Sequence, residues 1–240
     1  MSVNFPFCKG LRNIPTNKSQ IFKTAIINGC DKCKEYQVPT CDKCSIKFKL
    51  LDRYFDANIP IDYWQKNIAN FVGDKRLLDI YENMNVADSF KNGSSFLFKG
   101  QHGVGKTFMS CLILKKILEK GYRGLYSTLF DIVTTIVHGP NSEKYEANKE
   151  LKMIDFLVVD EFDSRFFAND ASAELNGRIL ESILRIRFQN ALPTIIITNN
   201  PDPTKCLGDA LGSSISSLIS GYAKEVSVIG SDFRKNKEQK

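Results

Sequence analysis

The chain has 240 residues, of which 42% are hydrophobic and 25% charged, a balance typical of a folded globular protein and not of a disordered one. Its apolar runs fall well short of the roughly 20 residues of a membrane helix, and the N-terminus lacks a secretory pattern, so we expect a cytoplasmic protein with no membrane partner. The net charge is +6, and residues 1–56 hold 10 of the 33 basic residues but only 5 of the 27 acidic ones. This local excess fits nucleic acid or an acidic partner, and equally an ordinary solvated surface.

Two C-x-x-C pairs lie early in the chain, formed by Cys30, Cys33, Cys41 and Cys44. Four thiolates are the donor set of tetrahedral Zn²⁺, and they leave no open coordination position, so we expect a structural site. An iron–sulfur cluster or a redox-active dithiol would use the same residues and stays an alternative. Because the surrounding segment has few long apolar stretches, we expect the metal to hold together an N-terminal module over residues 1–56.

The next segment, residues 57–92, has the patterning of a helical connector, and from residue 94 strand and helix patterns alternate. The predicted strands are 95–98, 124–128, 156–159 and 194–198, and the predicted helices are 105–120, 129–138 and 171–190. This alternation predicts an α/β fold with a parallel sheet and crossover helices. Since only about 40 residues follow the last strand, we expect a reduced lid of one or two elements.

A phosphate-binding loop is predicted between the first strand and the helix that follows it. The motif G-x-x-x-x-G-K-[ST] is matched at every fixed position by Gly100, Gln101, His102, Gly103, Val104, Gly105, Lys106 and Thr107. Glycines let backbone N–H groups approach phosphate oxygens, and the helix N-terminus adds partial positive charge. We therefore expect Lys106 to contact the β- and γ-phosphates of a nucleotide and Thr107 to ligate Mg²⁺.

Polar residues follow the third and fourth predicted strands. Asp160 and Glu161 end the apolar run 156–159. In P-loop ATPases a carboxylate at this place holds Mg²⁺ and an adjacent one activates the attacking water, so we expect these two roles for Asp160 and Glu161. After the fourth strand we expect Asn200 to sense the γ-phosphate with Asn199 as its neighbour, although both also fit a plain turn before a proline.

These motifs together resemble the DnaC/DnaI-type bacterial and phage helicase loaders, a branch of the AAA+ ATPases related to the IstB transposition helpers. The resemblance covers about residues 57–235, including a lead-in at 57–92 and a closing motif at 230–235. It implies an AAA+ ATPase domain over residues 57–240 that uses ATP and Mg²⁺, with Arg234 as a second nucleotide sensor. It also implies a replicative helicase hexamer and single-stranded DNA as partners, self-assembly, and docking of the zinc module on the helicase.

One departure from the family concerns hydrolysis. The family places a Ser-Arg pair after the sensor strand, and the arginine acts on the nucleotide of a neighbouring subunit. Here the matching stretch has Ser217 where the arginine is expected. Because such an arginine is worth about 10³–10⁵ in rate, we expect weak intrinsic ATPase activity that a partner stimulates.

The stretch 124–138 corresponds to a region that faces single-stranded DNA in these loaders. Tyr126, Ser127 and Thr128 are therefore candidate DNA contacts, by stacking or polar interactions. The alternative is that residues 129–138 form an amphipathic helix of the core.

Two other functions stay open. The first is a transposition helper on duplex DNA, against which the cysteine module and the low net charge of residues 57–240 both argue. The second is a zinc-dependent nucleic-acid-binding adaptor that uses nucleotide only as a structural ligand. A Glu161→Gln substitution would trap a switch ATPase with ATP bound, whereas an adaptor should tolerate it.

Overall fold

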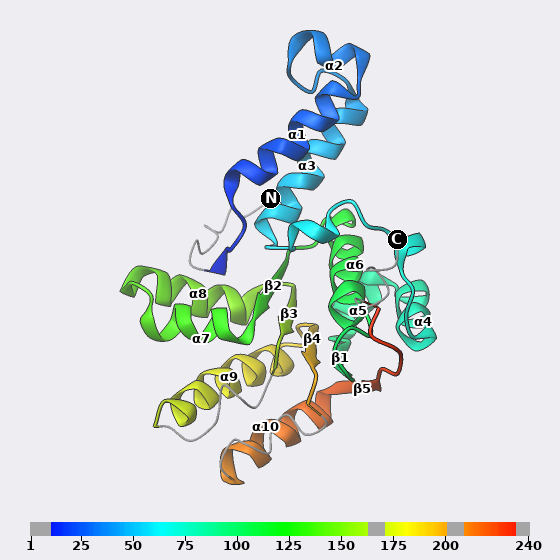
Figure 1. Ribbon diagram of the computed structural model, residues 1–240. Helices are drawn as coiled ribbons and strands as arrows, with labels where there is room; N and C mark the ends of the chain where they lie inside the picture. The colour runs from blue at the N-terminus through cyan, green and yellow to red at the C-terminus, as the bar shows by residue number, and fades with distance from the viewer. Residues whose placement is uncertain (1–10, 163–170, 201–208, 234–240) are drawn as a thin grey trace.

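A five-stranded parallel sheet forms the centre of the computed structural model, which describes residues 11–162, 171–200 and 209–233 (Figure 1). The strands are β1 (Ser95–Lys99), β2 (Gly124–Thr128), β3 (Phe156–Asp160), β4 (Thr194–Thr198) and β5 (Ala223–Ser227). They lie in the order β2-β3-β4-β1-β5, and each neighbouring pair is parallel. The predicted parallel sheet is confirmed, and the four predicted strands match β1 to β4 to within one residue.

The fifth strand is absent from the sequence-based prediction because it lies at an edge of the sheet. Only Ala223 and Val226 are buried in β5, while Lys224, Glu225 and Ser227 are exposed. A strand that faces solvent lacks the continuous apolar run of inner parallel strands. After β4 the described helix and strand are α10 (Asp209–Tyr222) and β5, and neither is the reduced lid expected there, which stays a prediction. Both elements belong to the layers of the sheet.

Helices cover both faces of the sheet, because the side chains of its inner strands alternate between two hydrophobic clusters. In β3, Leu157 and Val159 belong to one cluster, whereas Phe156 and Val158 belong to the other. The first cluster is completed by α7 to α10 and the second mainly by α6, with buried residues of the helices that precede the sheet (Figure 1). The bounds of these helices are α6 (Lys106–Glu119), α7 (Leu129–His138), α8 (Asn141–Met153) and α9 (Ala171–Gln189).

The three predicted helices agree with α6, α7 and α9 to within one residue at each end. Helix α8 was not expected, because its apolar stripe is narrow: its buried residues are Ala147, Glu150 and Leu151. Within the described ranges, no helix is both long and apolar enough to cross a membrane.

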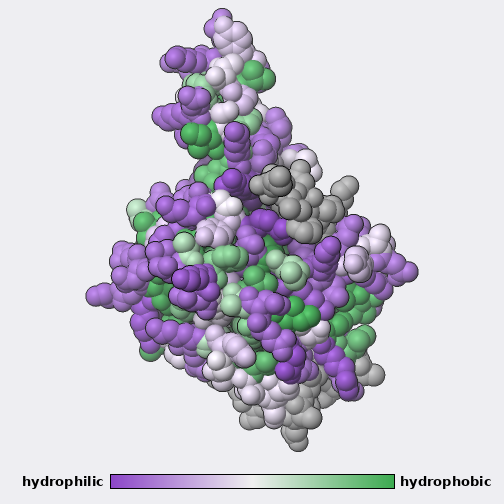
Figure 2. All heavy atoms as spheres, turned by 180° about the vertical axis from the view of Figure 1, so that it is seen from behind, coloured by the Kyte–Doolittle hydropathy of each residue, from purple (hydrophilic) through white to green (hydrophobic). Residues whose placement is uncertain are grey.

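The first three described α-helices form an arm that projects from the sheet, with α2 at the tip (Figure 1). They are α1 (Thr16–Asn28), α2 (Asp31–Tyr36) and α3 (Asp42–Asp56). Seen from behind, the arm is a narrow projection whose surface is mostly hydrophilic, with a few hydrophobic side chains between (Figure 2). The connector to the sheet contains two 3-10 turns and two helices, namely η2 (Ile61–Tyr63), η3 (Ile68–Asn70), α4 (Lys75–Asn83) and α5 (Val86–Asn92).

The base of the arm is attached to the end of α6. The guanidinium of Arg53 donates a hydrogen bond to the Leu118 carbonyl at 2.7 Å, and the Tyr54 hydroxyl donates to Glu119 Oε1 at 3.2 Å. Helix α6 begins at the phosphate-binding loop, so one helix connects that loop to the arm.

The first residues after the arm, Ala57 and Asn58, cover the outer edge of β2. The Tyr126 N–H donates to the Ala57 carbonyl at 2.8 Å, and Asn58 Nδ2 donates to the Tyr126 carbonyl at 3.1 Å. Asn58 also donates to the Leu11 carbonyl at 2.9 Å, and its φ of 54° places it in the left-handed region. These contacts satisfy backbone groups that an open edge would leave exposed.

A fully buried arginine holds the start of β4 in place. Arg187 donates hydrogen bonds to the carbonyls of Leu151, Ile154 and Pro193 and to Thr194 Oγ1. Burial lowers the pKa of Arg187 to about 9. The guanidinium thereby ties the end of α8 to the strand that leads to the candidate site.

Candidate nucleotide site and cysteine cluster

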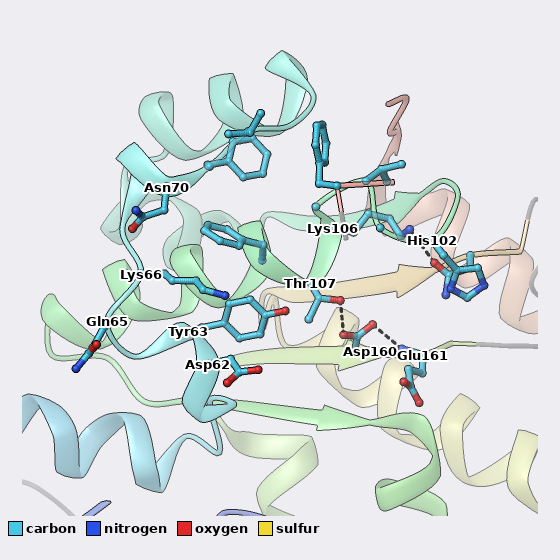
Figure 3. A pocket seen from close by; sticks show the side chains of 18 residues that line it. Asp62, Tyr63, Gln65, Lys66, Asn70, His102, Lys106, Thr107, Asp160 and Glu161 are labelled. Atoms are coloured by element: carbon cyan, nitrogen blue, oxygen red, sulfur yellow. Dashed lines mark hydrogen bonds between the residues drawn. The ribbon is translucent and has the colours of Figure 1, made fainter. Parts of the chain in front are cut away.

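A cavity of about 980 Å³ lies where β1, β3 and β4 end (Figure 3). Its lining comes from the phosphate-binding loop, from the residues that end β3 and follow β4, and from the connector between residues 62 and 72. The carboxyl edge of a parallel sheet is the usual place for a ligand site in α/β folds. The cavity therefore brings most of the predicted site residues to one place.

The phosphate-binding loop has the conformation that its sequence demands. Gly103 and Gly105 have φ angles of 77° and 95°, a region in which residues with a Cβ are strained. Lys106 is buried, and its Nζ donates to the carbonyls of Gly100 and Gln101 at 2.7 and 2.6 Å. The exposed side of the loop carries His102. The ammonium is thus held at the loop, as a phosphate contact requires.

The Asp160 carboxylate receives three hydrogen bonds. Its Oδ2 accepts from Thr107 Oγ1 at 2.8 Å and from the Tyr126 hydroxyl at 2.7 Å, and its Oδ1 accepts from the Glu161 N–H at 2.7 Å. Burial, followed by the charge of Asp160, raises the pKa of Tyr126, so the phenol stays protonated and donates. A hydroxyl and a carboxylate this close on the cavity wall are hard oxygen ligands, and they fit Mg²⁺.

Glu161 lines the same cavity and is exposed to solvent. Its φ of 54° lies in the left-handed region, an uncommon conformation for a residue with a side chain. The backbone therefore turns sharply between the two acidic residues, and Figure 3 shows their side chains next to each other at the end of β3. This separates a buried carboxylate, Asp160, from one that water can reach.

The structure favours Asn199 over Asn200 as the polar residue near the phosphates. Asn199 lines the cavity, and its Oδ1 accepts a hydrogen bond from Lys106 Nζ at 2.8 Å. Asn200 is not among the lining residues, and its N–H donates to Thr198 Oγ1 at 3.0 Å. Of the two adjacent asparagines, Asn199 is thus the one whose side chain is bonded to Lys106.

The prediction that Tyr126 and Ser127 contact DNA is wrong, whereas for the partly exposed Thr128 it stays a prediction. Tyr126 is 8% exposed and Ser127 is fully buried, because β2 packs between β3 and the chain that covers its edge. Thr128 caps α7 by accepting a hydrogen bond from the Asp131 N–H at 3.1 Å. The alternative, a core helix over 129–138, is what the structure shows.

An aromatic wall from the connector completes the cavity, and the sequence motifs do not reveal it. The rings of Tyr63 and Phe71 lie 5.6 and 5.7 Å from the Phe108 ring, measured between centroids. Lys66 Nζ lies 4.9 Å from the centre of the Tyr63 ring. The signal that could have found this wall is the recurrence of aromatic residues in the connector, at Tyr63 and Phe71, together with Phe108 directly after the phosphate-binding loop.

Arg234 and Ser217, the two residues that the family resemblance singles out near the C-terminus, are not seen at the cavity among the described residues. Arg234 lies outside the described residues, so its role stays a prediction. The residue before it, Phe233, lines the cavity, and its N–H donates to the Gly103 carbonyl at 3.2 Å. Ser217, at the place of the family's arginine, is exposed on α10.

The four predicted cysteines form one cluster at the tip of the arm. The sulfurs of Cys30, Cys33, Cys41 and Cys44 all lie within 4.8 Å of one another. Cys41 Sγ lies 3.7 Å from that of Cys30 and 3.6 Å from that of Cys33, which is close to the separation of about 3.8 Å that Zn–S bonds of about 2.3 Å give in a tetrahedron.

Groups around the cluster support a metal site. The Cys44 N–H donates to Cys41 Sγ at 3.4 Å, and the Thr40 hydroxyl donates to Cys33 Sγ at 3.5 Å. The hydrogen bond from Thr40 lowers the pKa of Cys33 to about 6, which favours the thiolate that a metal binds, whereas burial raises the pKa of Cys44, a thiol that would ionise only on binding the metal. The residues therefore fit Zn²⁺ in a structural role.

Comparison with known proteins reveals one group of relatives with a similar sequence. No family model matches the chain. The chain is 27% identical over 154 residues to the replicative helicase loader DnaC of Escherichia coli K12, which covers 59% of this chain and 60% of DnaC. The matched region therefore spans about three fifths of that relative.

Two solved structures have folds similar to that of this chain. DnaI superposes with a TM-score of 0.57 at 15% identity, covering 71% of this chain and 94% of DnaI. The DnaC helicase loader superposes with a TM-score of 0.50 at 23% identity, covering 74% of this chain and 99% of that structure. The chain therefore has an AAA+ fold, and it is similar in sequence to the DnaC-type helicase loaders.

Proposed function

We propose that this chain is an ATP-dependent loader that places a replicative helicase on single-stranded DNA. The observation that carries the proposal is the sequence similarity to DnaC over 154 residues. The structure adds two parts that such a protein would use: a cavity with a phosphate-binding loop, and an arm with a cysteine cluster.

In this proposal, Lys106 exchanges its carbonyl and amide partners for the β- and γ-phosphates of ATP, because an ammonium binds a charged phosphate oxygen more strongly than a neutral one. Thr107 and Asp160 hold Mg²⁺, which supplies charge neutralisation when bound. Asn199, released from Lys106 in this exchange, still lines the cavity next to the phosphate-binding loop and is placed to contact the γ-phosphate.

Glu161 takes the role of the residue that orients and activates the attacking water, since it is the acidic residue of the pair that solvent reaches. With Ser217 in place of the family's arginine, we propose that hydrolysis by the isolated chain is slow. ATP binding would then set the affinity for helicase and DNA, and hydrolysis would release the loader.

The arm is proposed as the module that docks on the helicase hexamer, with residues 1–56 as the module and 57–240 as the ATPase domain. Its surface combines basic residues with exposed apolar ones, a mixture suited to a protein partner. The exposed apolar residues of the arm are Ile21, Tyr36, Val38 and Ile46.

The test is co-purification of the full chain with the replicative helicase of the same host or phage, with and without ATP, followed by mass measurement of the complex. The Cys41→Ser/Cys44→Ser double variant should lose the complex. Cys111→Ala should keep it, because Cys111 is a buried core cysteine outside the cluster. Glu161→Gln should retain the complex in its ATP-bound form.

Other outcomes would contradict the proposal. If no nucleotide state supports a complex, the chain is not a loader for that helicase. Assembly on duplex DNA together with a transposase would instead favour the transposition helper. Full biological function of Glu161→Gln would favour the adaptor, in which nucleotide is only structural.

A further inference from the structure

A buried tyrosine on the neighbouring strand contacts the carboxylate that we assign to Mg²⁺. Tyr126 pairs with Val158 across β2 and β3, so its side chain points to the same face as Asp160, two residues further along β3. Its hydroxyl donates to Asp160 Oδ2 at 2.7 Å. The contact joins residues 34 positions apart in the sequence.

The three donors to Asp160 are not equivalent once a metal is present. Thr107 would turn the lone pairs of its hydroxyl oxygen toward Mg²⁺ and could then no longer direct its donor bond in the same way. Of the three donors described above, the Tyr126 hydroxyl and the Glu161 N–H would still hold the carboxylate. The Tyr126 hydroxyl acts on Oδ2, the oxygen that faces Thr107.

Tyr126 is itself held firmly. Its N–H and its carbonyl are bonded to Ala57 and to the side chain of Asn58. The residue is 8% exposed and packs in the same hydrophobic cluster as α6. A donor fixed in this way keeps the carboxylate in one orientation.

We propose that Tyr126 is a positioning residue that orients Asp160 for Mg²⁺, an inference that rests on the proposed nucleotide function. Hydrogen bonds from outside the ligand set orient metal-binding side chains, and their loss typically costs about 10–100-fold in metal affinity or activity. Tyr126 acts through Asp160 and contacts neither nucleotide nor metal.

The chain offers a matched control for this proposal. Tyr54 is 3% exposed, and its hydroxyl also donates to a carboxylate, Glu119 Oε1, at 3.2 Å. Glu119 is at the far end of α6 and does not line the cavity. Tyr126→Phe and Tyr54→Phe therefore remove the same buried group, one beside the proposed Mg²⁺ site and the other away from it.

The experiment measures the dissociation constant of a fluorescent ADP analogue for the full chain, in EDTA and in saturating Mg²⁺. We expect Tyr126→Phe to bind like wild type in EDTA, while the gain in affinity from Mg²⁺ falls by about 10–100-fold. Tyr54→Phe should match wild type in both conditions. An unchanged Mg²⁺ gain in Tyr126→Phe, or equal losses in both variants, would overturn the proposal.

Failure of the proposed function would look different. If wild type itself gains no affinity from Mg²⁺, the Mg²⁺-nucleotide function is wrong, and the role of Tyr126 is overturned with it. If Tyr126→Phe does not fold, 3-fluorotyrosine placed at position 126 alone provides the test. Its ¹⁹F signal should shift when Mg²⁺ and nucleotide are added together, whereas the same label at position 54 should not respond; no shift at position 126 would overturn the proposal.

Discussion

At the scale of single residues, Asp74 connects parts of the chain that the sequence separates widely. It caps α4 by accepting from the Arg76 N–H at 2.9 Å, and its Oδ2 accepts from the Ile229 N–H at 2.7 Å. Hydrogen bonds from the Arg76 side chain lower the pKa of Asp74 from 3.8 to about 2. The same carboxylate thus holds the start of α4 and the chain that leaves β5, which runs on to the contact of Phe233 with Gly103 in the phosphate-binding loop.

We expect Asp74→Ala to reduce the free energy of unfolding by about 1 kcal/mol near neutral pH, as for loss of a helix cap. Because the pKa is lower in the folded state than in the unfolded state, the stabilisation is present above about pH 4 and is lost as the pH falls toward about 2. Urea unfolding of wild type and of Asp74→Ala, from near-neutral pH down to about pH 2, measures the difference in their free energies of unfolding. Asp79→Ala, an exposed acid of the same helix, should show no comparable difference, and a wild-type advantage that persists at about pH 2 would contradict the expectation.

At the scale of elements, helix α6 connects the phosphate-binding loop, the connector and the arm. It starts at the phosphate-binding loop, and its end contacts the arm. Midway, Lys115 is 8% exposed, and its Nζ donates to the carbonyls of Tyr63, Trp64 and Lys66. These carbonyls belong to the connector whose side chains form the aromatic wall, so one ammonium sets the distance between the two sides of the cavity.

We expect Lys115→Met to weaken nucleotide binding by about tenfold or more, because three carbonyls lose their donor and the wall is released. Lys116→Met is the control: Lys116 Nζ donates at 2.7 Å to the Tyr81 carbonyl of α4, which does not line the cavity. Isothermal calorimetry with ADP and Mg²⁺ compares the two variants. Equal losses of affinity would mean that Lys115 contributes only to general stability.

At the scale of the whole molecule, the tip of the arm has a core separate from those of the sheet, whereas the base of the arm packs through Leu51 and Tyr54 in the same cluster as α6. The tip of the arm has its own small cluster of Ile27, Cys33 and Cys44, while two larger clusters lie on the faces of the sheet. So small an apolar cluster cannot order the tip alone, and the four sulfurs are placed to share one ion.

We expect removal of Zn²⁺ by a chelator, or Cys44→Ser, to unfold the tip of the arm and leave the sheet intact. Structural zinc contributes an apparent free energy of about 10–16 kcal/mol, far more than the apolar contacts of the tip supply. Hydrogen exchange should rise over residues 29–45 and stay low in β1, and nucleotide affinity should stay unchanged. Loss of nucleotide binding on chelation would show that arm and site are not separable.

The sequence alone determined the features that local chemistry encodes. Strands β1, β3 and β4 were predictable because inner parallel strands are buried on both faces and read as short apolar runs. The edge strand β2 was also predictable, since the chain that covers its edge leaves four of its five residues buried. The phosphate-binding loop was predictable because its glycines permit a backbone that other residues resist, and the cysteine cluster because two C-x-x-C pairs place four thiolates together.

The tertiary structure alone decided which side chains meet. It brought Asn199 instead of Asn200 to Lys106, placed the aromatic wall on the cavity with Lys115 bonded to the backbone behind it, and added β5 as a charged edge strand. It also turned Tyr126 from a predicted DNA contact into the partner of Asp160. Periodicity and motifs report only on neighbours along the chain, whereas these contacts join residues 34 to 93 positions apart, which only the packing of the sheet and its helices brings together.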